Sequence, residues 1–204
     1  RKLKSLDVSR FNTAKVTDMS AMFYRCKSLK KLDVSKFKTS KVKFMGAMFG
    51  DCISLEKLNL KNFKTGAVIE TAYMFENCYK LKSLDVSKFN TKNVEYMDAM
   101  FHNCKSLTNL KIKGFKTSKA ISMYAMFEGC KALKSLNLSS FNTSKVESME
   151  SMFSECRSLE NLNLNGFNTT KVTNMGEMFL WCKSLKNLEL SSFNTSKVNN
   201  MLEM

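Results

Sequence analysis

The stretch LDVSKFNTKNVEYMDAMFHNC, which runs from Leu84 to Cys104, decides the fold because its pattern repeats along the whole chain. The repeat is 26 residues long and has no insertion or deletion, as two of its positions show: Phe11, Phe37, Phe63, Phe89, Phe115, Phe141, Phe167 and Phe193, and Cys26, Cys52, Cys78, Cys104, Cys130, Cys156 and Cys182. A fixed period of this length indicates a solenoid of stacked repeats. We call each repeat a rung. Residues that share one position in every rung form a column, numbered 1 to 26 from Arg1.

Each rung begins with a stretch in which polar and apolar residues alternate. In the first rung Leu6 and Val8 are apolar, and the residues on either side of them are polar. This period of two predicts a half-buried strand at about residues 4–8 and at the same columns of every later rung.

The second half of the rung has a different apolar spacing. Its apolar residues fall at i, i+3, i+4 and i+7, in the first rung as Met19, Met22, Phe23 and Cys26. This spacing predicts a short helix with one apolar face. The intervening Phe11-Asn12-Thr13 predicts a turn, and we expect the Thr hydroxyl to satisfy turn backbone groups that would otherwise have no partner.

A single rung buries too little apolar surface to fold alone, so the rungs must stabilise one another by stacking and by hydrogen bonds. The chain has no Pro and seven Gly, and no linker interrupts it. We therefore expect an α/β solenoid of eight rungs, with a parallel β-sheet on one face and short helices or turns on the other. It forms a single domain, residues 1–204, with an incomplete last rung. Because neither end has a polar cap, we expect it to be a piece of a longer array.

Two motifs in the repeat resemble those of a known family. The run Met-Phe-x-x-Cys-x-x-Leu-x-x-Leu-x-Val, from Met22 to Val34, resembles the leucine-rich repeats of BspA-type bacterial surface proteins. The longer run from Leu84 to Phe101 is similar to the 26-residue surface-protein repeat subgroup of that family. The resemblance implies a leucine-rich-repeat solenoid on a microbial cell surface, with adhesion or binding of host matrix proposed for some members. The matched residues are packing residues, so the resemblance carries no motif for a particular ligand.

The chain has a formal net charge of +15, and its Lys residues follow columns, for example Lys15, Lys41, Lys119, Lys145, Lys171 and Lys197. Such ladders attract anionic polysaccharide, lipid headgroups or nucleic acid. The alternative is that they keep a repetitive surface soluble and prevent self-association. No known nucleic-acid-binding module accompanies the charge, which makes nucleic acid an unlikely partner. No apolar run approaches the ~20 residues of a membrane span, and we find no signal peptide.

The repeat itself explains the residues that would otherwise indicate chemistry. The seven Cys share one column and the chain has one His, which is not a metal-ligand spacing. We expect a ladder of buried, reduced thiols, with disulfides between rungs as the alternative. All 15 Met fall in two columns and are expected to pack the core, and His102, between Glu76 and Glu128 of the adjacent rungs, is interpreted as a solvated loop residue. We predict no catalytic residue, no cofactor and no metal.

Large aromatic residues also occur outside the core columns. Five consecutive rungs each supply one: Tyr24, Phe44, Tyr73, Tyr96 and Tyr124. The expected strand face has none, and Tyr79 and Trp181 lie elsewhere. Aromatic side chains anchor tight protein interfaces, so we predict that these five bind a partner. Accidental variation on a tolerant surface is the alternative.

The sequence therefore predicts a non-enzymatic interaction or adhesion module that binds a protein or extracellular-matrix ligand. The family resemblance implies that it lies at the cell surface or outside the cell. A structural spacer that projects another domain and a polyanion-binding solenoid are the alternatives. A spacer predicts that exposed columns vary without forming a patch, whereas adhesion predicts that the exposed aromatics cluster on one face.

Overall fold

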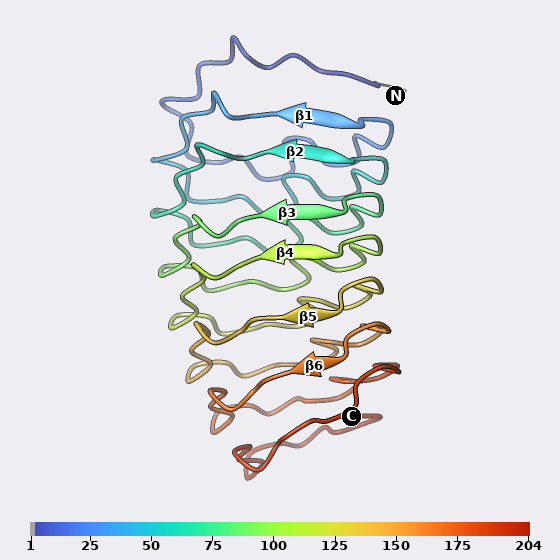
Figure 1. The fold of residues 1–204 in the computed structure, drawn as a ribbon. Helices are drawn as coiled ribbons and strands as arrows, with labels where there is room; N and C mark the ends of the chain where they lie inside the picture. The colour runs from blue at the N-terminus through green and yellow to red at the C-terminus, as the bar shows by residue number, and fades with distance from the viewer. Residues whose placement is uncertain (1–2) are drawn as a thin grey trace.

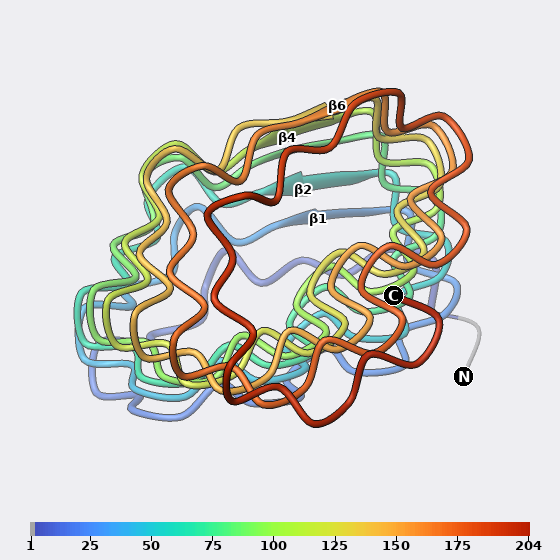
Figure 2. The same ribbon diagram turned by 90° about the horizontal axis from the view of Figure 1, so that it is seen from below.

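A computed structural model describes residues 3–204, which form a continuous stack of rungs (Figure 1). Every rung follows nearly the same path, so the rungs overlie one another when viewed along the stack (Figure 2). Parallel strands lie on one face, in a register of one strand per repeat. The predicted repeat solenoid with parallel strands is therefore confirmed.

The strand face carries six short strands: β1 (Lys31–Asp33), β2 (Lys57–Asn59), β3 (Ser83–Asp85), β4 (Asn109–Lys111), β5 (Ser135–Leu136) and β6 (Asn161–Leu162). Each strand turns its Leu inward and exposes its neighbours, and Leu32 of β1 pairs with Leu58 of β2. The strands pair two by two, β1 with β2, β3 with β4 and β5 with β6. They are thus shorter than predicted and form three two-stranded sheets in place of one continuous sheet.

The Met-Met-Phe-Cys segments are not helices, so this part of the prediction is wrong, and residues 3–204 contain no α-helix. Each segment is a series of turns in which columns 21 and 25 adopt positive φ, as at Ala21 (53°) and Arg25 (58°). A left-handed residue at every fourth position is incompatible with a right-handed helix. Of the predicted "short helices or turns", the turns are what the chain forms.

Along these segments the backbone amides donate hydrogen bonds alternately to carbonyls of the next rung and to carbonyls of their own rung. In the first rung the donors to the next rung are Met19, Ala21, Phe23 and Arg25, at 2.8–2.9 Å, and the donors within the rung are Met22, Tyr24 and Cys26. The resulting ladder joins all eight rungs, from Asp18 to Asn200. We call the surface formed by columns 17–25 the ladder face, and in Figure 2 it is the corrugated region beside the C-terminus.

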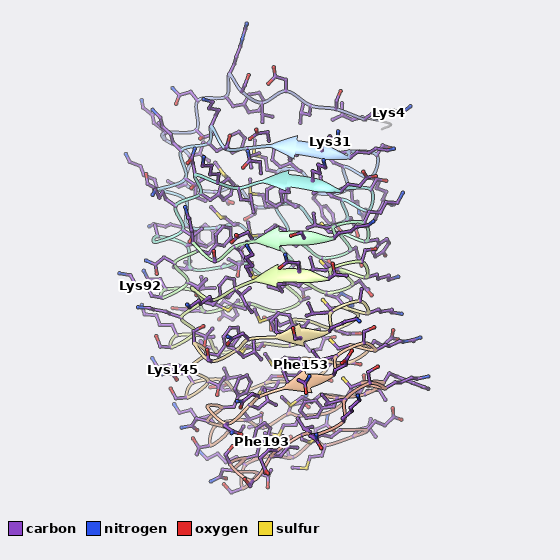
Figure 3. The ribbon with its side chains drawn as sticks, viewed as in Figure 1. Lys4, Lys31, Lys92, Lys145, Phe153 and Phe193 are labelled. Atoms are coloured by element: carbon purple, nitrogen blue, oxygen red, sulfur yellow. The ribbon has the colours of Figure 1, made fainter. Side chains whose placement is uncertain are left out.

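The interior is filled by the apolar columns. The Phe rings of column 23 stack with their centroids 5.6–5.9 Å apart, from Phe23 to Phe179. Twelve of the 15 Met are buried, as predicted, and the other three lie in the first and last rungs. Figure 3 shows Phe153 within the stack, whereas Lys92 and Lys145 extend away from it.

Candidate functional site

All five aromatic residues predicted from the sequence lie on the ladder face and are exposed. Their exposed fractions are 39% for Tyr24, 38% for Phe44, 41% for Tyr73, 46% for Tyr96 and 39% for Tyr124. The strand face has no comparable exposed aromatic. The aromatics are therefore confined to one side of the solenoid.

Backbone hydrogen bonds bring three of the five together. The amide of Tyr73 donates to the carbonyl of Asp98 at 2.8 Å, and that of Thr71 donates to the carbonyl of Tyr96 at 3.1 Å. The amide of Ala99 donates to the carbonyl of Tyr124 at 2.7 Å. Tyr73, Tyr96 and Tyr124 thus occupy three adjacent rungs.

Phe44 extends this cluster by one more rung. It lies in the same column as Tyr96, and Glu70 bridges to both of them in the ladder. We call Phe44, Tyr73, Tyr96 and Tyr124 the aromatic patch.

Tyr24 stands apart from the aromatic patch. It lies in column 24 of the first rung, where its ring covers Gly50 so closely that a side chain at Gly50 would meet it at 3.1 Å. The guanidinium of Arg25 lies 5.0 Å from the centre of this ring and also pairs with Asp51 at 3.3 Å. The ring of Tyr24 is therefore already in contact with Gly50 and Arg25 of its own chain.

Trp181, which the sequence analysis set aside, belongs to the ladder face as well. It lies in column 25, is 52% exposed, and has the ammonium of Lys183 4.7 Å from its ring centre. The series of turns that the chain forms in place of the predicted helix brings column 25 onto one face with columns 18–21.

Two acidic residues, Glu70 and Asp98, occupy ladder positions next to residues of the aromatic patch. Glu70, between Phe44 and Tyr96, accepts a hydrogen bond from the amide of Ala72 at 3.1 Å, and burial raises its pKa. Asp98 accepts hydrogen bonds from the amide of Tyr124, at 3.0 Å, and from the hydroxyl of Ser122. Both carboxylates are held by the backbone at defined places on the face.

Asp98 and other carboxylates of the ladder face also affect the pKa values of two tyrosine hydroxyls. Burial, followed by the charges of Asp98 and Glu76, raises the pKa of Tyr73. Burial, followed by Glu128 and Glu150, raises the pKa of Tyr124. Both phenols therefore stay protonated and can donate hydrogen bonds beside an acidic surface.

The interpretation of His102 as a solvated residue is wrong. Its side chain is 23% exposed, and its ring lies between Glu76 (Nδ1 to Oε1, 3.2 Å) and Glu128 (Nε2 to Oε1, 3.7 Å). Burial lowers its pKa, but the hydrogen bonds and charges of Glu128 and Glu76 outweigh burial and raise the pKa to about 9. His102 is thus cationic at neutral pH and connects three rungs.

The ladder face is acidic although the chain as a whole is strongly basic. Columns 17–25 hold 12 of the 18 Asp and Glu residues, and only two of the 33 Lys and Arg residues, Arg25 and Lys43. The remaining columns hold 31 Lys and Arg and six Asp and Glu. The Lys columns alone do not reveal this segregation, but the columns of the acidic residues show it in the sequence.

Three other kinds of feature could indicate a function: hollows outside the ladder face, clusters of metal-ligating side chains and membrane-spanning helices. A hollow on the strand face, over β5 and β6, is lined mainly by Ser, Asn and Leu. Within residues 3–204 no three His, Cys, Asp or Glu side chains gather as metal ligands would, and no helix is long and apolar enough to cross a membrane.

The structure carries all seven Cys as free thiols. Five are buried as predicted, but Cys26 and Cys182, in the first and seventh rungs, are only half-buried. The thiol of Cys52 donates to the carbonyl of Phe23 at 3.2 Å, and the same contact recurs up to Cys182. The thiols therefore contribute to the contacts between rungs.

The chain matches one family model and is similar to solved structures of leucine-rich-repeat proteins. Residues 1–110 and 97–204 match a family model described as "Mycoplasma protein of unknown function, DUF285". A leucine-rich-repeat protein of T. pallidum aligns with 88% of this chain and 76% of its own, at 18% identity and a TM-score of 0.53. A leucine-rich cell surface protein of Faecalibacterium prausnitzii aligns with 85% of this chain and 57% of its own, at 19% identity and a TM-score of 0.48.

No curated protein sequence matches the chain. The chain spans less than two thirds of the F. prausnitzii protein. The likeness to the T. pallidum protein shows a leucine-rich-repeat fold, which confirms the resemblance that the repeat motifs indicated.

Proposed function

We propose that the chain, which belongs to the DUF285 family of Mycoplasma proteins of unknown function, is a non-enzymatic interaction module. In this proposal residues 1–204 act as one leucine-rich-repeat domain at the cell surface. The domain binds a protein or extracellular-matrix ligand through the aromatic patch.

The observation that carries the proposal is the gathering of exposed aromatics in adjacent rungs of one face. In the same columns other rungs carry small or polar residues such as Ser20, Gly46 and Asn174, so packing of the scaffold does not require a ring there. Exposed aromatic clusters are the usual centres of protein interfaces. A spacer, in contrast, needs no patch.

The test replaces Phe44, Tyr73 and Tyr96 by Ser. A matched control replaces Tyr24, Tyr79 and Trp181 by Ser, which removes three aromatics that lie outside the patch. Binding to a panel of purified extracellular-matrix proteins is measured by surface plasmon resonance, and folding by circular dichroism. We expect the patch variant to lose binding and the control to keep it, with both folded.

The same experiment separates the alternatives. If the Lys columns bind a polyanion such as heparin, binding will collapse between low and moderate salt and the patch variant will still bind. If the wild-type protein binds neither matrix proteins nor heparin at any salt concentration, the spacer becomes the better explanation.

A further inference from the structure

We propose that the ligand of the aromatic patch is a cationic protein segment, rich in Lys or Arg, which the carboxylates of the ladder face attract and the patch rings hold. This inference rests on the proposed function and names the chemistry of the partner. It follows from the distribution of charge, from the acidic residues at ladder positions next to the patch residues, and from the absence of cations over the patch rings.

The charge distribution selects the sign of the partner. A chain of net charge +15 repels cations at long range, yet its acidic residues concentrate on the one face that also carries the aromatic patch. Within about 8–10 Å, the distance over which charges act at physiological salt, the ladder face governs what approaches it. An anionic ligand would instead be directed to the remaining columns, where nearly all Lys and Arg lie.

The geometry of the patch suits Lys and Arg side chains. Asp98 lies between Tyr73 and Tyr124, and Glu70 lies between Phe44 and Tyr96. A ring next to a carboxylate provides both a π-face and a counter-charge for an ammonium or guanidinium group. The pairing of rings with carboxylates recurs over successive rungs, so an extended segment meets several such places.

Three other rings outside the core columns already have cations over them. Arg25 lies over Tyr24, Lys105 over Tyr79 and Lys183 over Trp181, at 4.3–5.0 Å from the ring centres. Among residues 3–204, no Lys or Arg lies over the rings of the aromatic patch. The patch therefore leaves open the position that a partner's cation would occupy.

The test uses a fluorescent octalysine peptide and the intact chain. The face variant carries Glu70→Gln, Asp98→Asn and Glu150→Gln. The control variant carries Asp33→Asn, Asp85→Asn and Glu189→Gln on the strand face, where each acid accepts a backbone amide hydrogen bond, as Glu70 and Asp98 do on the ladder face. Both variants gain the same net charge and keep an amide oxygen at each site.

We expect wild type to bind octalysine at about 0.05–0.15 M salt despite its positive net charge. The face variant should bind about tenfold more weakly or worse, and the control should bind as wild type does. No binding by wild type, or an equal loss in both variants, would overturn the proposal. Formation of salt-sensitive oligomers by wild type, abolished in the face variant, would also overturn it and assign the face to the Lys columns of a second copy.

The two proposals fail in different ways. Binding of matrix proteins that depends on the aromatic patch, without binding of octalysine, refutes the cationic partner and leaves the interaction module standing. Binding of octalysine to the face, without any matrix ligand, supports the cationic chemistry and refutes matrix binding.

Discussion

The hydroxyl of Thr117 accepts a hydrogen bond from the amide of Asn142 and donates one to the carbonyl of the same residue, both at 2.8 Å. Thr117 is fully buried. The same pair of bonds recurs between adjacent rungs from Thr13 and Lys38 to Thr169 and Asn194. One hydroxyl per rung thus satisfies an amide and a carbonyl of the following rung, as the sequence predicts for the Thr column.

Replacement of Thr117 by Val should therefore destabilise the fold by about 1–3 kcal/mol, because it leaves the amide and the carbonyl of Asn142 without the partner that the hydroxyl supplies. Thr195 occupies the same column but is exposed, and Thr195→Val should change the free energy of unfolding by less than about 0.5 kcal/mol. Urea unfolding of the two variants measures both values. Equal losses would show that the hydroxyl column does not hold the rungs together.

Replacement of Phe89 by Ala should cost about 3–5 kcal/mol, the usual loss for a buried Phe. Phe89 is 3% exposed, and its ring stacks on that of Phe63 at 6.2 Å. Phe11→Ala is the matched control, since Phe11 has the same column but is 49% exposed. It should cost less than half as much in the same urea measurement, and a similar cost for both would mean that burial does not determine the contribution of this column.

The sequence predicts the period, the core columns and the parallel register because these depend on side-chain hydrophobicity, which repeats with few exceptions, such as Thr71 in a Met column. It mispredicts the Met-Met-Phe-Cys segments because apolar residues at i, i+3, i+4 and i+7 also fit this series of turns. Ala, Tyr and Glu adopt positive φ there, as at Ala99, Tyr73 and Glu155, at a cost of roughly 1–2 kcal/mol each. Only the ladder of inter-rung hydrogen bonds compensates that cost, and a single rung does not reveal it.

The five candidate aromatics could be found from their columns, but their grouping could not. Tyr24 lies in column 24 and Tyr124 in column 20, and only the path of the turns shows which of the two belongs to the patch. The sequence already places His102 between Glu76 and Glu128 of the adjacent rungs, but it does not show that the ring turns from solvent to contact both carboxylates.

The buried thiols should be unreactive in the native protein. Burial raises the pKa of Cys52 to about 12 and that of Cys182 to about 11, and it also raises the pKa of Cys104 well above its usual value. Because the thiolate is the reactive form, a disulfide reagent at pH 8 should modify at most the half-buried Cys26 and Cys182, and slowly. All seven should react in denaturant. Rapid native reaction of Cys104 would contradict the burial of this column.

The pair of contacts made by His102 predicts a pH dependence of stability. Its folded pKa of about 9 lies above the unfolded value of about 6.5, so protonated His102 stabilises the fold fully below about pH 6.5. This stabilisation is lost as the pH rises through about 9. The contribution is on the order of 1–3 kcal/mol, since the ring is partly exposed.

His102→Gln isolates this contribution. Urea unfolding at pH 6 and at pH 9.5 should show wild type more stable than the variant at the lower pH, and the difference should shrink at the higher pH. Ionisation of the Cys thiols in the unfolded state also lowers stability above about pH 8.5, but it affects both proteins equally and cancels in the difference. If the difference between the two proteins is the same at both pH values, the ring of His102 packs between Glu76 and Glu128 without its charge contributing to the fold.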